Sequence, residues 1–200
     1  YRLRGGAQSM AVDMADFEDT PLTHDREYDE DELWDSYEYF LSEVLPVAEE
    51  AGVTLALHPN DPPTDQKLGG IPQLFRSFES FKRAMNIVES DNHGLEFCLG
   101  NWSEMGADIP EVIEYFGERD EIEYVHFQTV SGPLPKFHEV FVDQEGYYDP
   151  ETILQQLHDV GFDGMIMPGH VPTLQGDGSW NERRRAFTIG YLKGISDTIR

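Results

Sequence analysis

Three residues that commonly bind transition metals stand at matching places in the sequence. His58, Cys98 and His126 each lie at or near the carboxyl end of a short apolar run. A lone histidine there is more often an ordinary core residue, and a lone cysteine a small buried hydrophobe. Three such residues in corresponding positions instead favour a shared site. Mixed imidazole and thiolate ligands suit Zn²⁺, Fe²⁺ or Mn²⁺, and three ligands with open positions are typical of catalytic metals.

A fourth apolar run does not end in a metal-binding residue. It is followed by Pro168, Gly169 and His170. A carboxylate at position 169 would complete a four-ligand set, but glycine is present. We predict that His170 acts as an acid or base. The alternative is that it only lines the pocket.

These residues require a scaffold that brings distant strand ends together. Short apolar runs alternate with helical patterns along the chain, which is typical of βαβ units and a parallel sheet. The predicted strands are residues 53–58, 95–99, 122–128 and 164–167, and the predicted helices are residues 33–50, 75–88, 110–116, 150–160 and 182–199. The carboxyl ends of the strands of a parallel barrel all lie on one face, where loops build the active site.

The same order of elements predicts an α/β fold that forms part of a (β/α)8 TIM barrel. The four strands, with perhaps a fifth near residues 7–13, are too few to close it. We therefore expect a single incomplete barrel domain over residues 1–200, with the missing strands upstream of Tyr1 or in a second chain. Residues 129–149 are expected to form an active-site loop with a short strand at 137–142. Within it, His138 and Glu139 either reach the pocket or form an exposed pair.

Charge and hydropathy restrict the classes of partner. The chain of 200 residues has 39 acidic and 14 basic residues, for a formal net charge of −25. Such a surface repels nucleic acid and anionic membranes, so neither is expected as a partner. It is also typical of a protein adapted to high salt. The sequence has no apolar run of about 20 residues and no signal pattern, which predicts a cytoplasmic protein.

Several motifs together resemble one enzyme family across nearly the whole chain. They include Leu55-Ala-Leu-His-Pro-Asn-Asp-Pro-Pro63, Gly94-Leu-Glu-Phe-Cys-Leu-Gly-Asn101, Tyr124-Val-His-Phe127 and Gly161-Phe-Asp-Gly164. Each fragment alone is weak, but their combination and order are specific. The chain resembles mannonate dehydratase, a metal-dependent lyase with a xylose-isomerase-like barrel. On this basis, the chain would cover roughly the C-terminal half of that barrel or more.

The resemblance implies a reaction and a set of ligands. His58, Cys98 and His126 would bind Mn²⁺ or Fe²⁺, and D-mannonate would be converted into 2-keto-3-deoxygluconate and water. The partner would be a small sugar acid. A homo-oligomer is a further possibility, although the sequence does not define the oligomeric state. We assign contacts with the substrate to four residues, Asn60, Asp61, Gln128 and Trp180.

The chain departs from the family pattern at polar positions of this pocket. The family usually has aspartate where Gly169 and Asn60 stand, arginine where Gln73 and Gln128 stand, and a catalytic tyrosine near Trp180. Each departure removes charge or acid–base capacity. Two alternatives therefore stay open. The same barrel and metal could serve a sugar isomerase or epimerase, or the chain could be a non-catalytic descendant that binds a ligand or a partner chain.

Overall fold

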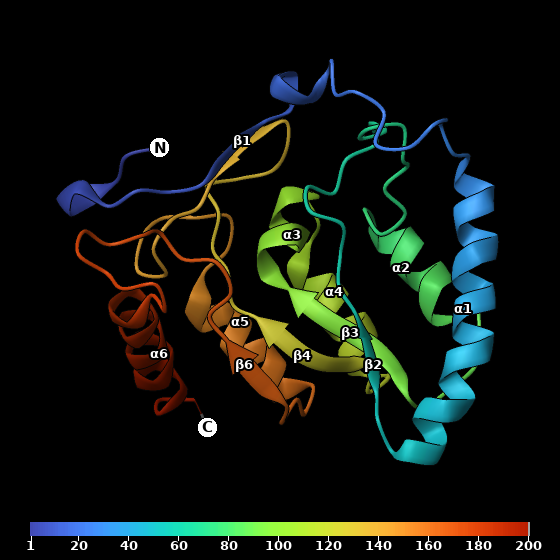
Figure 1. Cartoon of the computed structure of the whole chain (residues 1–200). Helices are drawn as coiled ribbons and strands as arrows, with labels where there is room; N and C mark the ends of the chain where they lie inside the picture. Colours follow the sequence, from blue (N-terminus) through green and yellow to red (C-terminus); the bar gives the residue numbers. More distant parts are fainter. Residues whose placement is uncertain (200) are drawn as a thin grey trace.

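A four-stranded parallel sheet lies at the centre of the structure, which is a computed structural model describing residues 1–199. The strands follow one another in chain order, which confirms the predicted βαβ organisation (Figure 1). In spatial order they are β2 (Leu55–Leu57), β3 (His93–Cys98), β4 (Ile122–His126) and β6 (Met165–Met167). Within the described residues, β2 and β6 form the edges of this sheet.

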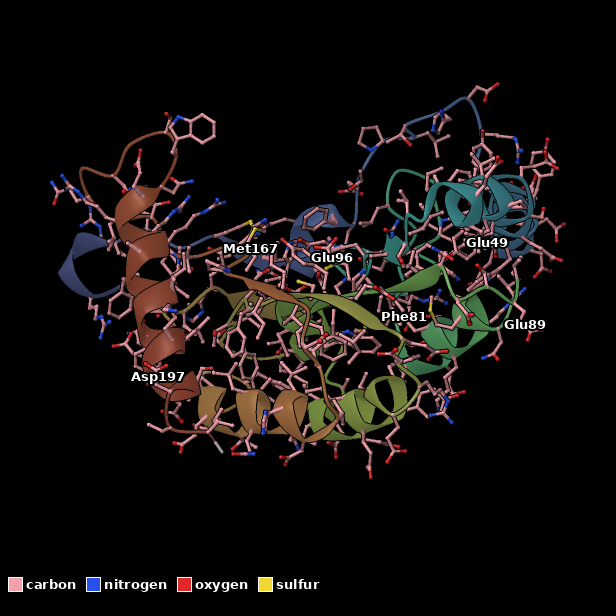
Figure 2. All side chains as sticks on the ribbon, turned by 90° about the horizontal axis from the view of Figure 1, so that it is seen from below. Glu49, Phe81, Glu89, Glu96, Met167 and Asp197 are labelled. Atoms are coloured by element: carbon pink, nitrogen blue, oxygen red, sulfur yellow. The ribbon has the colours of Figure 1, made fainter. Side chains whose placement is uncertain are left out.

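Helices cover one face of the sheet and flank both of its sides. Figure 2 shows α4 and α5 beneath the strands, with α1 and α6 at opposite flanks. The helices are α1 (Glu30–Ala51), α2 (Phe78–Met85), α3 (Leu99–Glu104), α4 (Ile109–Gly117), α5 (Pro150–Asp159) and α6 (Glu182–Ser196). Within residues 1–199, none of these helices is long and apolar enough to cross a membrane.

Strand alternation separates the core from the opposite face. Leu95 and Phe97 of β3 are fully buried in the hydrophobic core, which also contains Phe81 and Trp102 from the covering helices. Because successive side chains of a strand point to opposite faces, Glu96 points away from the helices, as Figure 2 shows. Cys98 and the ends of the neighbouring strands share this second face, so one face builds the core and the other is available for a site.

Local capping signals define where the helices begin and end. Asp149 accepts a hydrogen bond from the backbone N–H of Thr152 at the start of α5, and Asp108 caps α4 in the same way. Gly52 adopts a left-handed conformation (φ 64°) that ends α1, a conformation that glycine adopts without steric cost. The second predicted helix was too long, because Ser77 caps its start and leaves only Phe78–Met85 helical.

The N-terminal segment differs from the prediction. Strand β1 (Ala11–Asp13) pairs antiparallel with β5 (Lys136–His138), and these two strands form a separate sheet. The segment near residues 7–13 is therefore not a strand of the parallel barrel. The strand expected at residues 137–142 is also shorter and lies at 136–138. Both differences have one cause: this pairing joins segments more than 100 residues apart, which no local pattern reveals.

Candidate metal centre

Three strand ends bring the predicted ligands together. Cys98 and His126 are the last residues of β3 and β4 and are paired in register, and His58 directly follows β2. One potential ligand atom from each of the three residues lies within 4.8 Å of the other two. The rings of His58 and His126 meet edge to face, with centroids 5.6 Å apart. Small side-chain adjustments would place all three around one ion.

Both histidines are oriented by a contact at Nδ1. The Nδ1 atom of His58 lies 2.6 Å from the carbonyl oxygen of Pro59, and that of His126 lies 2.6 Å from Oε1 of Glu96. A ring whose Nδ1–H faces an oxygen leaves Nε2 free to bind a cation, and such outer contacts commonly fix metal-binding histidines. Burial lowers the pKa of His126, which favours the neutral ring that a metal needs.

The cysteine is buried and has a polar neighbour. Burial raises the pKa of the Cys98 thiol, and Sγ lies 3.6 Å from Oε1 of Gln128. The side chain of Gln128 packs directly over Gly100, since a Cβ at that position would lie 2.6 Å from Cδ of Gln128. A divalent cation would have to displace the thiol proton, because the thiolate is the ligand form. The three donors thus fit a transition-metal ion in chemistry and in spacing.

A second group of ionisable side chains surrounds this centre. Nδ1 of His170 lies 3.3 Å from Oε1 of the buried Glu139, a contact that raises the pKa of His170. Burial, reinforced by the negative charge of Asp61, raises the pKa of Glu104 to about 8. Asp61 and Glu104 also raise the pKa of Cys98, so these groups lie close enough to the centre to influence it electrostatically.

Position 169 lies directly beside the centre. A Cβ built on Gly169 would be 3.4 Å from Cβ of His126 and 3.5 Å from Cβ of Gln128, which are ordinary contacts. The backbone at Gly169 has no left-handed φ that would reserve it for glycine. The position therefore has room for the Cβ of a side chain such as the aspartate that the resemblance leads one to expect there.

The four residues predicted to contact the substrate lie in different environments. Gln128 is buried beside Cys98, and Asp61 is exposed at the end of the sheet that carries the site. Asn60 instead holds the loop after β2 against the segment before α2, since its Oδ1 accepts a hydrogen bond of 2.7 Å from the backbone N–H of Phe75. Trp180 is 79% exposed, and no hydrogen bond or ring contact joins it to the residues of the centre within the described part of the chain.

Sequence reasoning missed some of the residues around the centre. Glu96 and Glu104 were not predicted, although Glu96 alternates with the core residues of its strand and could have been found from that pattern. Glu139 reaches His170, whereas its neighbour His138 stacks on Tyr1 with ring centroids 3.9 Å apart. Glu139 therefore reaches the pocket, as one of the two alternatives predicted, whereas His138 neither reaches it nor is fully exposed.

The match to a family model covers almost the whole chain. The model of D-mannonate dehydratase (UxuA) matches residues 8–200. Mannonate dehydratase 2 of Halalkalibacterium halodurans is 30% identical over 176 residues, which are 85% of this chain and 50% of that protein. Mannonate dehydratase of Thermotoga maritima is 32% identical over 180 residues, 86% of this chain and 49% of that protein. The chain spans about half the length of these curated relatives.

Solved structures agree with the predicted fold. A crystal structure of mannonate dehydratase from Streptococcus suis superposes with a TM-score of 0.88 at 28% identity, covering 98% of this chain and 59% of that one. A xylose isomerase-like TIM barrel protein from Mycobacterium smegmatis gives a TM-score of 0.61 at 16% identity. The superposition covers 90% of this chain and 55% of that one. The second likeness shows the fold alone and confirms a partial xylose-isomerase-like barrel. With the family match over residues 8–200, these findings establish that the chain belongs to the D-mannonate dehydratase family.

Proposed function

We propose that this chain is the metal-binding part of a hydro-lyase that converts D-mannonate into 2-keto-3-deoxygluconate and water. The observation that carries the proposal is the meeting of His58, Cys98 and His126 at three adjacent strand ends of a chain from this family. The mixture of imidazole and thiolate donors favours Mn²⁺ or Fe²⁺ over Mg²⁺, which prefers oxygen ligands.

The residues around the centre suit the two proton movements of a dehydration. A divalent cation bound there would neutralise the charge that develops on the substrate carboxylate as the neighbouring C–H proton leaves. His170, in its neutral form, would take that proton, and the buried Glu139 would hold its ring in place. Gln128 and Asp61 would contact the hydroxyl or carboxylate groups of the sugar acid.

Metal content and product formation test the proposal together. The natural full-length protein should contain stoichiometric transition metal, and after chelation and reloading with Mn²⁺ or Fe²⁺ it should form the keto acid from D-mannonate. Cys98→Ser should lower metal affinity by at least about tenfold, since a thiolate ligand is lost. The exposed His158 supplies the control variant His158→Gln, which should bind metal as the wild type does.

Two results would overturn the proposal. A folded, metal-loaded protein that does not act on D-mannonate, but does interconvert other sugars, would indicate an isomerase or epimerase on the same barrel. A protein without bound metal, in which Cys98→Ser leaves ligand binding unchanged, would indicate a non-catalytic descendant. The family match favours the dehydratase over both alternatives.

A further inference from the structure

Glu104 is a carboxyl group enclosed by protein beside the metal centre. It is the last residue of α3, the short helix that begins directly after Cys98, and it is only 1% exposed. Nδ2 of Asn101 donates a hydrogen bond of 3.0 Å to Oε2. The other oxygen, Oε1, has no hydrogen-bond partner within the described residues. A buried polar atom without a partner calls for an explanation, and a bound ligand is one.

Two further unpaired atoms lie on residues next to the same centre. Oδ1 of Asn101 and Nε2 of Gln128 are buried and also have no hydrogen-bond partner in the part of the chain that the structure describes. Gln128 contacts Cys98, and Asn101 contacts Glu104. Acceptors and a donor left unpaired around a metal centre match the needs of a ligand rich in hydroxyl groups, because each hydroxyl both donates and accepts.

The charged groups that face Glu104 come from several elements. Asp61 follows β2, Glu139 follows β5 and His170 follows β6, while Cys98 lies at the start of the helix of Glu104. Burial is the main cause that raises the pKa of Glu104 to about 8, and Asp61 and Glu139 add to it, whereas His170 opposes it. Burial thus favours the protonated form of this carboxyl group, which is the form that can donate a proton.

The dehydration proposed above needs such a group, because a hydroxyl leaves readily only when it receives a proton. The resemblance leads one to expect an acid–base residue near Trp180, but this side chain points into solvent, and Gly169 offers no side chain. We propose that Glu104 is the proton donor of the reaction. This inference rests on the proposed function and adds a residue that the family resemblance did not supply.

The proton balance closes without another reactant. The C–H bond beside the substrate carboxylate breaks, and its proton goes to the neutral ring of His170. The C–O bond of the adjacent hydroxyl breaks, and the hydroxyl leaves as water with the proton of Glu104, while a carbon–carbon double bond forms. The resulting enol becomes the keto acid by moving one proton from oxygen to carbon. The imidazolium of His170 then loses the proton that it accepted and Glu104 regains one, so both groups return to their starting states.

The decisive experiment compares two leaving groups. Glu104→Gln keeps the shape of the side chain but has no proton to give, so conversion of D-mannonate should fall on the order of 100-fold or more. An analogue with fluorine in place of the departing hydroxyl releases fluoride without protonation. Fluoride release by the variant should stay within about threefold of wild type. The exposed Glu114 supplies the control Glu114→Gln, which should leave both reactions unchanged.

Other results of this experiment would overturn either the role of Glu104 or the proposed function. Equal losses of both reactions in a folded, metal-loaded Glu104→Gln protein would show a structural role and overturn the inference, as would an unchanged rate with D-mannonate. A wild-type protein inactive on D-mannonate would instead overturn the proposed function. If the variant does not fold, infrared titration of the wild type decides: absence of a protonated carboxyl band that disappears near pH 8 overturns the role of Glu104.

Discussion

A buried carboxyl group with a raised pKa makes the stability of the fold depend on pH. The pKa of Glu104 is about 8 in the folded protein against an ordinary value of 4.5. Because the folded-state pKa is raised, the associated stability is fully present below about pH 4.5 and is lost as pH rises through about 8. Over this range the unfolded chain gives up a proton that the folded chain retains.

The variant Glu104→Gln should remove this pH dependence. The free energy of unfolding of the wild type, minus that of the variant, should decrease as pH rises from about 4.5 to about 8, by roughly a few kcal/mol in total. Urea unfolding at a series of pH values measures this difference. The control Glu114→Gln should give a flat difference. A flat difference for Glu104→Gln as well would mean that Glu104 titrates normally in the folded protein.

The room beside Gly169 leads to a second prediction at the residue scale. Gly169→Asp should introduce a carboxylate next to His126, where the new Cβ makes only ordinary contacts with its neighbours at 3.4 Å or more. We expect metal affinity to rise about tenfold or more, which corresponds to about 1.4 kcal/mol. Calorimetric titration with Mn²⁺ measures it. Gly169→Asn, of the same size but uncharged, is the matched control, and equal affinity of both variants and wild type would contradict the prediction.

At the scale of elements, the contact between α3 and the end of β4 depends on one glycine. Alanine usually stabilises a helix by up to about 1 kcal/mol relative to glycine. At position 100 the added methyl group would lie 2.6 Å from the side chain of Gln128, so Gly100→Ala should instead destabilise the fold by roughly 1–3 kcal/mol. Denaturant unfolding checks the sign. Gly132→Ala is the control, because no atom lies within 4 Å of its new Cβ; a Gly100→Ala variant as stable as wild type would show that Gln128 moves freely.

The parallel sheet could be predicted because each of its strands follows a helix with a clear apolar pattern. Helix α3 could not, since its six residues are all buried and have no polar face that would reveal a helical period. The pairing of β1 with β5 depends on contacts between distant segments. The meeting of His58, Cys98 and His126 was predictable from their places at strand ends. Glu104 was not, because nothing in the sequence distinguishes a buried neutral carboxyl group from an exposed charged one.

At the scale of the whole molecule, the most prominent feature is the excess of acidic over basic residues. Even if all 14 basic residues were paired with acidic ones, 25 of the 39 acidic residues would lack a basic partner (39 − 14 = 25). Repulsion among such groups weakens the compact state. Added salt shortens the range of this repulsion, from about 10 Å at 0.1 M to about 3 Å at 1 M.

Stability should therefore increase with salt. The midpoint of thermal unfolding is expected to rise between dilute buffer and about 1 M KCl, where surface charges are largely screened. Sucrose at equal osmolality is the control, because it stabilises folded proteins without screening charge. A midpoint that KCl raises no more than sucrose would remove the support for adaptation to high salt.

The length of helix α3 has one more consequence, which concerns insertions and deletions next to the centre. Cys98 immediately precedes the helix and Glu104 ends it, so the backbone between them has a fixed length, on the order of 9 Å at the usual rise per residue. The helix therefore fixes the spacing between the candidate metal-binding thiol and the neighbouring carboxyl group. An insertion or deletion within α3 would therefore move the thiol and the carboxyl group relative to each other, whereas a substitution in a loop elsewhere would leave their spacing unchanged.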